Sequence, residues 1–222
     1  MSSAVTPVVH NRAVFFDRDG TLSEEVGYVN HISRFQLLPT TGRAIRKLND
    51  AGWRAIVVTN QAGVARGYFE ESLIGQVHTT LRAELAKDGA FLDAIYYCPH
   101  HPSAGEPPYR QNCNCRKPKT GMLEQAVNTF KVDLSRSYVV GDKYSDVELA
   151  HRVGAKGILV LTGYGRGEYE YQRQTWPRDP DFIAEHVLEA VEWILATNNV
   201  QLGTTTDRRN TPRSPFRGFP HL

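Results

Sequence analysis

The apolar residues 14–16 lead directly into two aspartates, Asp17 and Asp19, which are followed by a Gly-Thr turn. An apolar run without polar alternation predicts a strand that is buried on both faces of a parallel sheet. The aspartates then lie at the carboxyl end of this strand, where open α/β sheets bind their ligands. Two neighbouring carboxylates favour a bound cation, which offsets their repulsion. The simpler alternative is an acidic turn.

Short apolar runs alternate with amphipathic stretches along the rest of the chain. The runs predict strands at residues 13–16, 55–59, 94–97, 138–140 and 157–161, and the stretches predict helices between Thr40 and Gly52 and at residues 70–87, 121–130, 145–153 and 183–196. A Thr N-cap is expected for the first helix, and residues 163–167 are expected to form a glycine-rich loop. This alternation predicts a three-layer α/β fold with helices on both faces of a parallel sheet.

The chain has 222 residues and an ordinary content of apolar and charged residues. We therefore expect one globular domain over residues 1–196 and a disordered tail over residues 197–222. The net charge is +2, but residues 203–222 contain four arginines and one aspartate, so the remainder is nearly neutral. A neutral body argues against a nucleic-acid partner. Because no apolar segment has the length of a signal peptide or membrane span, a cytoplasmic protein without membrane contact is expected.

Polar side chains follow four of the predicted strands. In order along the chain they are Asp17 and Asp19, Thr59 and Asn60, Arg116 and Lys117, and Asp142 and Asp146. Carboxylates suit Mg²⁺, cations neutralise phosphate oxygens, and a hydroxyl orients them. Each residue alone is as easily a cap, a turn residue or a solvated side chain. Together, at one edge of a sheet, they predict a site for phosphoryl transfer.

A segment rich in cysteine and histidine follows the third predicted strand. Four ligands there suit a tetrahedral, structural Zn²⁺ ion: Cys98, Cys113, Cys115 and one of His100 and His101. Such an ion would pin a loop that has little core of its own. Three free cysteines beside a surface pair of histidines are the alternative.

Four motifs of the haloacid dehalogenase (HAD) superfamily of phosphatases are matched in order by Asp17-x-Asp19-Gly-Thr, Thr59, Lys117 and Gly141-Asp142-x-x-x-Asp146. The chain resembles this superfamily over about residues 13–165, which implies its central parallel sheet of five strands and no large cap domain. The resemblance implies that Asp17 is the nucleophile and Asp19 the general acid and base, with Thr59 and Lys117 stabilising the phosphoryl group. It also implies a catalytic Mg²⁺ held by Asp17, the backbone carbonyl of Asp19, and Asp142.

The Cys-Pro-His-His-Pro and Cys-x-Cys-Arg-Lys-Pro segments resemble the zinc-binding histidinol-phosphatase and heptose-bisphosphatase branch of this superfamily. That branch uses the first histidine, which implies His100 as the zinc ligand. Residues 25–29 resemble the heptose-bisphosphatases in particular. The resemblance implies Lys143 beside the magnesium site and a substrate-binding set of Glu25, Val26, Gly27, Tyr28, Asn60, Gln61, Ala62 and Arg116. Ala62 replaces a frequent serine, which puts one hydrogen bond in doubt, and residues 163–167 also differ from some members.

These resemblances imply a Mg²⁺-dependent phosphatase, acting as a monomer, that removes the C7 phosphate of D-glycero-D-manno-heptose 1,7-bisphosphate for lipopolysaccharide or other surface-glycan synthesis. The closest rival is a histidinol-phosphate phosphatase, whose substrate needs carboxylate or aromatic groups around its amine and imidazole. Arg66 and Arg116 favour the bisphosphate. A nucleic-acid 3′-phosphatase would need a basic body. The non-enzymatic alternative is a zinc-stapled binding module, which the intact acids and Lys117 disfavour.

Overall fold

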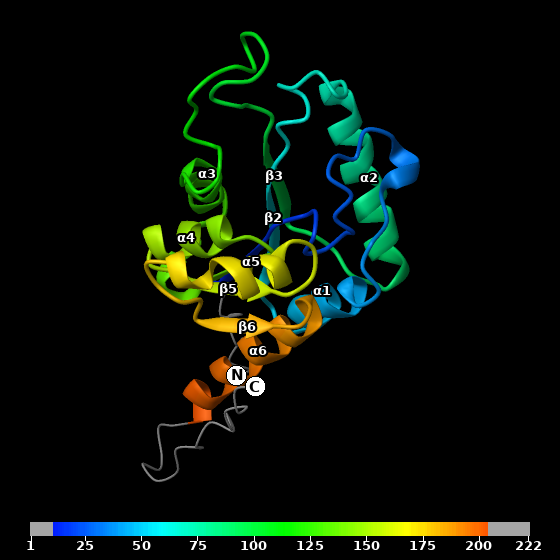
Figure 1. Cartoon of the computed structure of the whole chain (residues 1–222). Coiled ribbons are helices and arrows are strands. Elements are labelled where there is room, and N and C mark those ends of the chain that lie inside the picture. The colour runs from blue at the N-terminus through cyan, green and yellow to red at the C-terminus, as the bar shows by residue number, and fades with distance from the viewer. Residues whose placement is uncertain (1–10, 204–222) are drawn as a thin grey trace, which may run out of the picture.

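The computed structural model describes residues 11–203, which form a parallel sheet with helices on both faces (Figure 1). Six strands lie in the order β3-β2-β1-β4-β5-β6, and every neighbouring pair is parallel. The strands are β1 (Ala13–Phe16), β2 (Arg54–Asn60), β3 (Ala94–Cys98), β4 (Tyr138–Gly141), β5 (Lys156–Val160) and β6 (Phe182–Ala184). β1 lies inside the sheet and is buried over its whole length, as an apolar strand covered on both faces should be.

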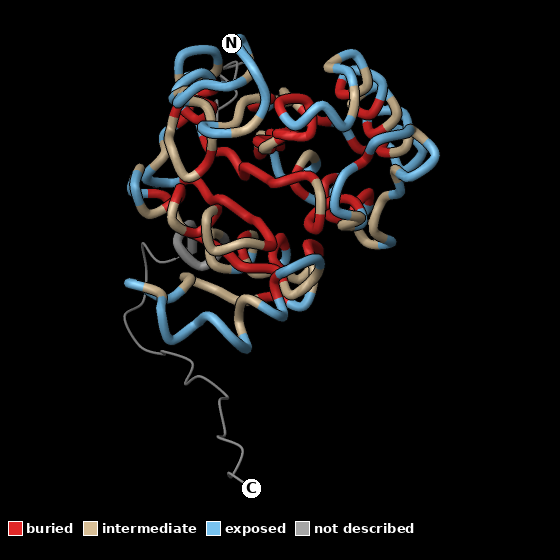
Figure 2. Tube along the Cα trace, turned by 45° about the horizontal axis from the view of Figure 1, so that its top comes forward, coloured by how far each residue is buried: buried red, intermediate tan, exposed pale blue. Residues whose placement is uncertain are grey.

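Two hydrophobic cores lie on the two faces of this sheet. Val14 and Phe16 of β1 belong to the core beneath α1, α2 and α6, whereas Ala13 and Phe15 belong to the core beneath α3 and α4. This division follows from the alternation of side chains along a strand. The buried segments run through the centre of the molecule, and the exposed residues lie on its loops and on the outer faces of its helices (Figure 2). The helices are α1 (Thr41–Asp50), α2 (Glu71–Lys87), α3 (Gly121–Phe130), α4 (Tyr144–Arg152), α5 (Gly165–Gln172) and α6 (Val187–Gly203), with 3-10 turns at Ile32–Arg34, Leu134–Arg136 and Arg173–Thr175.

The α/β class is confirmed, and the structure corrects several local expectations. The sheet has a sixth strand, β6, where the last helix was expected to begin, and α6 starts only at Val187. α6 then continues past the expected boundary at residue 196, so residues 197–203 are helical, while the rest of the predicted tail lies outside the described residues. Residues from Gly165 onward form α5 instead of a loop. Thr40 makes no side-chain cap bond at α1, and the Thr41 hydroxyl donates to the Leu22 carbonyl at 2.7 Å.

The carboxyl ends of the strands meet at one edge of the sheet, where long loops rise from β1, β2 and β3 (Figure 1). Backbone hydrogen bonds hold this edge together. The N–H of Asp17 donates to the Val140 carbonyl at 2.9 Å, and the N–H of Gln61 donates to the Cys98 carbonyl at 2.7 Å. The loop at residues 99–120 contains no helix or strand of its own. Within residues 11–203, no helix combines the length and apolar character that crossing a membrane requires.

Candidate active site

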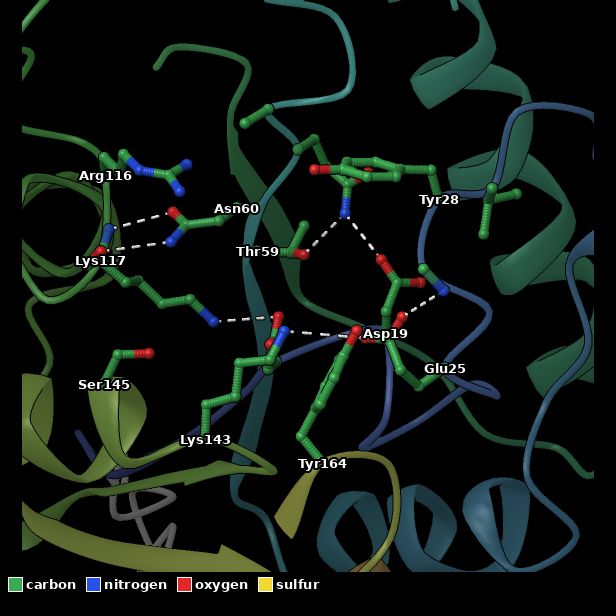
Figure 3. A pocket seen from close by; sticks show the side chains of 15 residues that line it. Asp19, Glu25, Tyr28, Thr59, Asn60, Arg116, Lys117, Lys143, Ser145 and Tyr164 are labelled. Atoms are coloured by element: carbon green, nitrogen blue, oxygen red, sulfur yellow. Dashed lines mark hydrogen bonds and ion pairs between the residues drawn. The ribbon is translucent and has the colours of Figure 1, made fainter. Parts of the chain in front are cut away.

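A pocket of about 360 Å³ opens at the carboxyl edge of the sheet (Figure 3). Residues from β2, from the first turn of α4 and from the loops that follow β1, β2, β3, β4 and β5 line it, so segments far apart in the sequence meet there. The lining residues are Asp17, Asp19, Glu25, Gly27, Tyr28, Val29, Thr59, Asn60, Gln61, Ala62, Arg116, Lys117, Lys143, Ser145 and Tyr164. The pocket therefore gathers nearly all of the residues that the sequence assigned to catalysis and substrate binding. Val26 is not among the lining residues, and Asp142 is fully buried.

Lys117 reaches from the loop after β3 to the acids at the end of β1 (Figure 3). Its Nζ lies 3.0 Å from Asp17 Oδ1 and 2.6 Å from Asp146 Oδ1, and all three side chains are buried. Burial alone would lower the pKa of Lys117, but Asp146 and Asp17 outweigh it and hold that pKa above the ordinary value. Lys117 is therefore a fixed positive charge beside Asp17.

Three carboxylates, Asp17, Asp142 and Asp146, place oxygen atoms within 4.8 Å of one another. Burial, assisted by repulsion from Asp17, raises the pKa of Asp142 to about 8. Burial also raises the pKa of Asp146 to about 6, although Lys117 opposes it. Asp142 Oδ1 is buried and has no hydrogen-bond partner within residues 11–203. These carboxylates repel one another, and one of their buried oxygens has no partner among the described residues. Such a site fits a hard divalent cation such as Mg²⁺.

Two glycines make room for the carboxylate of Asp142. Gly20 has φ +81° and Gly163 has φ +53°, and a Cβ atom at these positions would lie only 2.0 Å and 2.3 Å from Asp142 Oδ2. The N–H of Tyr164 donates to the same oxygen at 2.9 Å. The Gly-Thr turn after the two aspartates therefore does more than reverse the chain, because a side chain at Gly20 would displace Asp142.

Asp19 is held by donors on both of its oxygens. Arg18 donates from Nε to Oδ1 at 2.9 Å and from Nη2 to Oδ2 at 2.7 Å. Ser23 Oγ donates to Oδ1 at 3.2 Å, and Gln61 Nε2 donates to Oδ2 at 2.9 Å. Burial would raise the pKa of Asp19, but the charge and hydrogen bonds of Arg18, aided by Gln61 and Ser23, lower it overall. The donors around Asp19 therefore favour its carboxylate form, which is the form that accepts a proton.

The three polar residues at the end of β2 connect the parts of the site. Gln61 Nε2 donates to Thr59 Oγ1 at 3.0 Å as well as to Asp19, so it bridges these two side chains. Asn60 pairs with the backbone of Lys117: its Nδ2 donates to the carbonyl at 3.2 Å, and its Oδ1 accepts from the N–H at 3.0 Å. Asn60 therefore places Lys117 in addition to lining the pocket.

The loop after β1 forms another wall of the pocket. Glu25 Oε2 lies 3.8 Å from Lys143 Nζ, and Oε1 accepts a hydrogen bond from the Gly27 N–H at 2.6 Å. Burial raises the pKa of Glu25, while Lys143 partly offsets that rise. The ring of Tyr28 packs edge-on against Tyr68, with 4.7 Å between the ring centroids.

Val26 stands apart from the residues expected to bind substrate. It is half-buried, it does not line the pocket, and its carbonyl accepts a hydrogen bond from Arg34 Nη2 at 2.9 Å. Its backbone instead helps to shape the loop that carries Glu25 and Tyr28.

Three lining residues were not identified from the sequence: Val29, Ser145 and Tyr164. The Lys143 Nζ lies 4.2 Å from the ring centroid of Tyr164, a cation–π contact between two residues that line the pocket. The glycines around Tyr164 marked the segment as unusual, but a glycine-rich pattern does not say which side chain faces a pocket. Ser145 lies two residues after Lys143 in the first turn of α4, which was the available signal.

The cysteine-rich loop brings four candidate metal ligands together. Atoms of Cys98, His100, Cys113 and Cys115 lie within 4.8 Å of one another. The Sγ atoms of Cys98 and Cys113 are 3.5 Å apart, and His100 Nδ1 is 3.3 Å from Cys115 Sγ. This set of three sulfurs and one nitrogen fits a closed, tetrahedral Zn²⁺ site.

His101 is directed away from this cluster. Its Nδ1 accepts a hydrogen bond from the Ala104 N–H at 2.9 Å, and its Nε2 lies 3.0 Å from Arg66. Arg116 follows the last cysteine directly, and its Nη1 donates to the His100 carbonyl at 3.3 Å. Two members of the cluster, Cys115 and His100, therefore adjoin Arg116, one in the chain and one through this hydrogen bond, and Arg116 lines the pocket.

Comparison with known proteins supports a common ancestry with phosphatases. A model of the HAD-hydrolase-like family matches residues 114–190. D-glycero-D-manno-heptose-1,7-bisphosphate 7-phosphatase of Thermosynechococcus vestitus is 45% identical over 190 residues, covering 82% of this chain and 94% of that protein. D-glycero-beta-D-manno-heptose-1,7-bisphosphate 7-phosphatase of Escherichia coli K12 is 43% identical over 153 residues, covering 68% of this chain and 80% of that protein.

A solved structure also resembles the whole fold. The crystal structure of D,D-heptose 1,7-bisphosphate phosphatase from B. bronchiseptica, complexed with magnesium and phosphate, superposes with a TM-score of 0.75. The two chains are 30% identical, and the match covers 84% of this chain and 99% of that one.

Proposed function

This chain belongs to the HAD-like hydrolases, among the heptose-bisphosphate phosphatases, and we propose that it removes the C7 phosphate of D-glycero-D-manno-heptose 1,7-bisphosphate. One observation supports this proposal most strongly. Asp17, Asp19 and Lys117 line one pocket, above the buried Asp142, in a chain 45% identical to such an enzyme over 94% of that enzyme's length. The same reaction would supply a step in nucleotide-activated heptose synthesis, for lipopolysaccharide or another surface glycan.

The side chains suggest a division of work in two steps. A carboxylate oxygen of Asp17 attacks phosphorus and forms an aspartyl-phosphate. The bond between phosphorus and the C7 oxygen breaks, and this oxygen takes the proton of Asp19, which enters this step in its protonated form. A water molecule then attacks this phosphate and gives its proton to Asp19, which restores Asp17 and releases phosphate. Lys117 and the Thr59 hydroxyl stabilise the phosphoryl oxygens throughout.

The acid cluster would hold Mg²⁺ through Asp17, Asp142 and the backbone carbonyl of Asp19, with Asp146 beside it. The ion supplies charge neutralisation between the attacking carboxylate and the phosphate. Lys143 lies next to Asp142 in the chain and faces Glu25. A structural Zn²⁺ ion at Cys98, His100, Cys113 and Cys115 completes the proposed metal content.

The setting in the cell and the assembly state are also part of the proposal. The three cysteines are free and grouped as ligands, which suits the reducing cytoplasm better than a disulfide would. The proposed enzyme is a monomer that acts on a small-molecule substrate.

Histidinol phosphate is the second candidate substrate, because the pocket wall contains the carboxylate of Glu25 and the rings of Tyr28 and Tyr164. Such groups can hold an amine and an imidazole. Arg116 and Lys143 favour a second phosphate instead, since both are cations at the same pocket.

The test is a comparison of kcat/KM for the α and β anomers of heptose 1,7-bisphosphate and for histidinol phosphate, with zinc and magnesium analysis of the same preparation. We expect the highest value for a heptose bisphosphate anomer. A higher kcat/KM for histidinol phosphate would overturn the substrate assignment. The Asp17→Asn variant should lose nearly all turnover, and phosphate release at the parent rate would overturn the aspartyl-phosphate mechanism and favour a binding module.

A further inference from the structure

We propose that Arg18, between the two aspartates at the end of β1, is a positioning residue that aligns the carboxylate of Asp19 for proton transfer. This inference rests on the proposed function, in which Asp19 gives a proton to the leaving oxygen. The sequence alone offered no role for Arg18. The structure makes it the residue in closest contact with the proton-transferring group.

The side chain of Arg18 is almost completely enclosed, with 1% of its surface exposed. Its Nε and Nη2 donate to the two oxygens of Asp19 in a two-pronged arrangement, at 2.9 Å and 2.7 Å. A guanidinium fork is planar and rigid, so it sets the plane of a carboxylate as well as its position. A lysine at this site would supply the charge without setting that plane.

Other contacts hold Arg18 itself in place. Its free Nη1 lies 3.4 Å from His78 Nε2 on α2, and the guanidinium carbon lies 6.0 Å from the ring centroid of Phe35. Its backbone N–H donates to Asp17 Oδ1 at 2.7 Å, and its carbonyl accepts from the Ser23 N–H at 3.0 Å. Arg18 therefore touches the proposed nucleophile through its backbone and the proposed acid through its side chain.

Burying a guanidinium is costly, and a buried ion pair is seldom more stable than apolar packing. The buried pair of Arg18 and Asp19 is therefore better explained by its placement of Asp19 than by a gain in stability. Only 21% of the Asp19 side chain remains exposed, and that part faces the pocket. Because Ser23 and Gln61 also donate to this carboxylate, it has little freedom to turn away from a substrate.

If Arg18 positions the acid, the loss of kcat/KM in Arg18 variants should depend on the leaving group. The alkoxide of a sugar is a poor leaving group and needs the proton from Asp19, whereas p-nitrophenolate leaves without one. Because kcat/KM reports the steps up to cleavage of the P–O bond, the two esters separate proton transfer from phosphate binding. General-acid catalysis contributes roughly 10²- to 10⁴-fold, so misplacement of the acid should cost a substantial part of that.

The experiment compares the parent with Arg18→Lys and Arg18→Met on heptose 1,7-bisphosphate and on p-nitrophenyl phosphate. We expect Arg18→Lys to lower kcat/KM about 100-fold for the sugar ester and less than about 3-fold for the aryl ester. Arg18→Met should show the same asymmetry, and Arg18→Lys keeps the buried charge if Arg18→Met fails to fold. Arg46→Lys is the matched control, because Arg46 pairs with Asp50 on the exposed surface of α1.

A double-mutant cycle shows whether Arg18 acts through Asp19. In an Asp19→Asn background, Arg18→Lys should cause no further loss on the sugar ester, because the group that it positions is already gone. Equal losses on both esters, or additive losses in the cycle, would overturn the inference and leave Arg18 a merely structural residue. A parent protein that hydrolyses neither ester would overturn the proposed function and this inference with it. A parent active on both, with unchanged Arg18 variants, would overturn this inference alone.

Discussion

Lys117 is a buried cation whose Nζ pairs with the carboxylates of Asp17 and Asp146. Replacing it by methionine keeps most of its length but leaves these acids without their counter-charge. We expect Lys117→Met to lower kcat/KM by about 10²- to 10³-fold, because a charge that stabilises the phosphoryl oxygens is lost. Unfolding in magnesium-free buffer should become easier by roughly 3 to 5 kcal/mol, as for other broken buried pairs.

Steady-state kinetics and urea unfolding measure these two effects. Lys87→Met is the matched control, because Lys87 lies on the exposed surface of α2 and pairs there with Glu84. If Lys117→Met kept the stability of the parent, the charge on Lys117 would not be what balances the acid cluster.

His78 gives a pH dependence whose sign follows from its surroundings. Burial, together with the nearby Arg18, lowers the pKa of His78 from 6.5 to about 4. Between about pH 4 and pH 6.5, His78 is therefore protonated in the unfolded chain but neutral in the folded chain. The free energy of unfolding is therefore unaffected by His78 above pH 6.5, and it decreases as the pH falls towards about 4.

We expect His78→Gln to change the free energy of unfolding little at pH 7.5. Between pH 7.5 and pH 4.5 the variant should gain about 2 kcal/mol of stability over the parent. Urea unfolding of both proteins at the two pH values measures this difference. His31→Gln, at an exposed turn, provides the comparison. If the free energy of unfolding depended on pH in the same way for the parent and for His78→Gln, the pKa of His78 would not be lowered by folding.

The residues that follow predicted strands were those that the sequence identified best. Asp17 and Thr59 lie at the ends of β1 and β2, and a parallel sheet brings such strand ends together. Lys117 lies on the loop after β3 and reaches the same pocket from there. The fork of Arg18 and the inward position of Tyr164 were not predictable in this way. Both depend on side-chain direction within loops, which has no periodic pattern.

The loop at residues 99–120 is the element with the least regular structure around the pocket. Three candidate zinc ligands, His100, Cys113 and Cys115, lie in this loop, and the fourth, Cys98, ends β3. Glu71 on α2 accepts a hydrogen bond from Tyr109 in the loop at 2.7 Å and another from Tyr97 in β3 at 2.9 Å. Because Arg116 directly follows the ligand Cys115, loss of the metal should release a pocket residue.

We expect Cys113→Ser to lose bound zinc and to raise KM for heptose 1,7-bisphosphate at least about 10-fold, the loss that removing one charged contact commonly causes. Metal analysis by mass spectrometry and steady-state kinetics measure the two effects. Ser103→Ala lies in the same loop outside the cluster and should change neither. A Cys113→Ser protein that retained one zinc ion per chain would contradict the proposed ligand set.

At the scale of elements, long periodic segments were predicted well and short ones were not. The apolar spacing of residues 121–130 gave α3 with its observed ends. β6 has only three residues, and its Phe-Ile-Ala run fits a helical face as well as a strand. α5 begins with Gly-Arg-Gly, where helix propensity is poor, so the sequence favoured a loop although a helix forms there.

The whole molecule depends on one sheet that separates two hydrophobic cores. Leu48 on α1 belongs to one core and Leu123 on α3 to the other, and both are fully buried. Because both cores pack against the same strands, loss of packing on one face removes support from the other. The described residues should therefore unfold as one cooperative unit, which is also what the predicted single domain implies.

Leu48→Ala and Leu123→Ala test this cooperativity from opposite faces of the sheet. Each should lower the free energy of unfolding by roughly 2 to 5 kcal/mol, because each leaves a cavity in a packed core. With zinc and magnesium present, urea unfolding followed by far-UV circular dichroism and by residual activity should give one shared midpoint for each variant. Phe91→Ala removes a ring that is 57% exposed and should shift the midpoint much less. If activity were lost before circular dichroism in Leu123→Ala but not in Leu48→Ala, the face beneath α3 would unfold separately. The pocket would then depend on that face alone, since the chain enters α3 directly from the loop that carries Lys117.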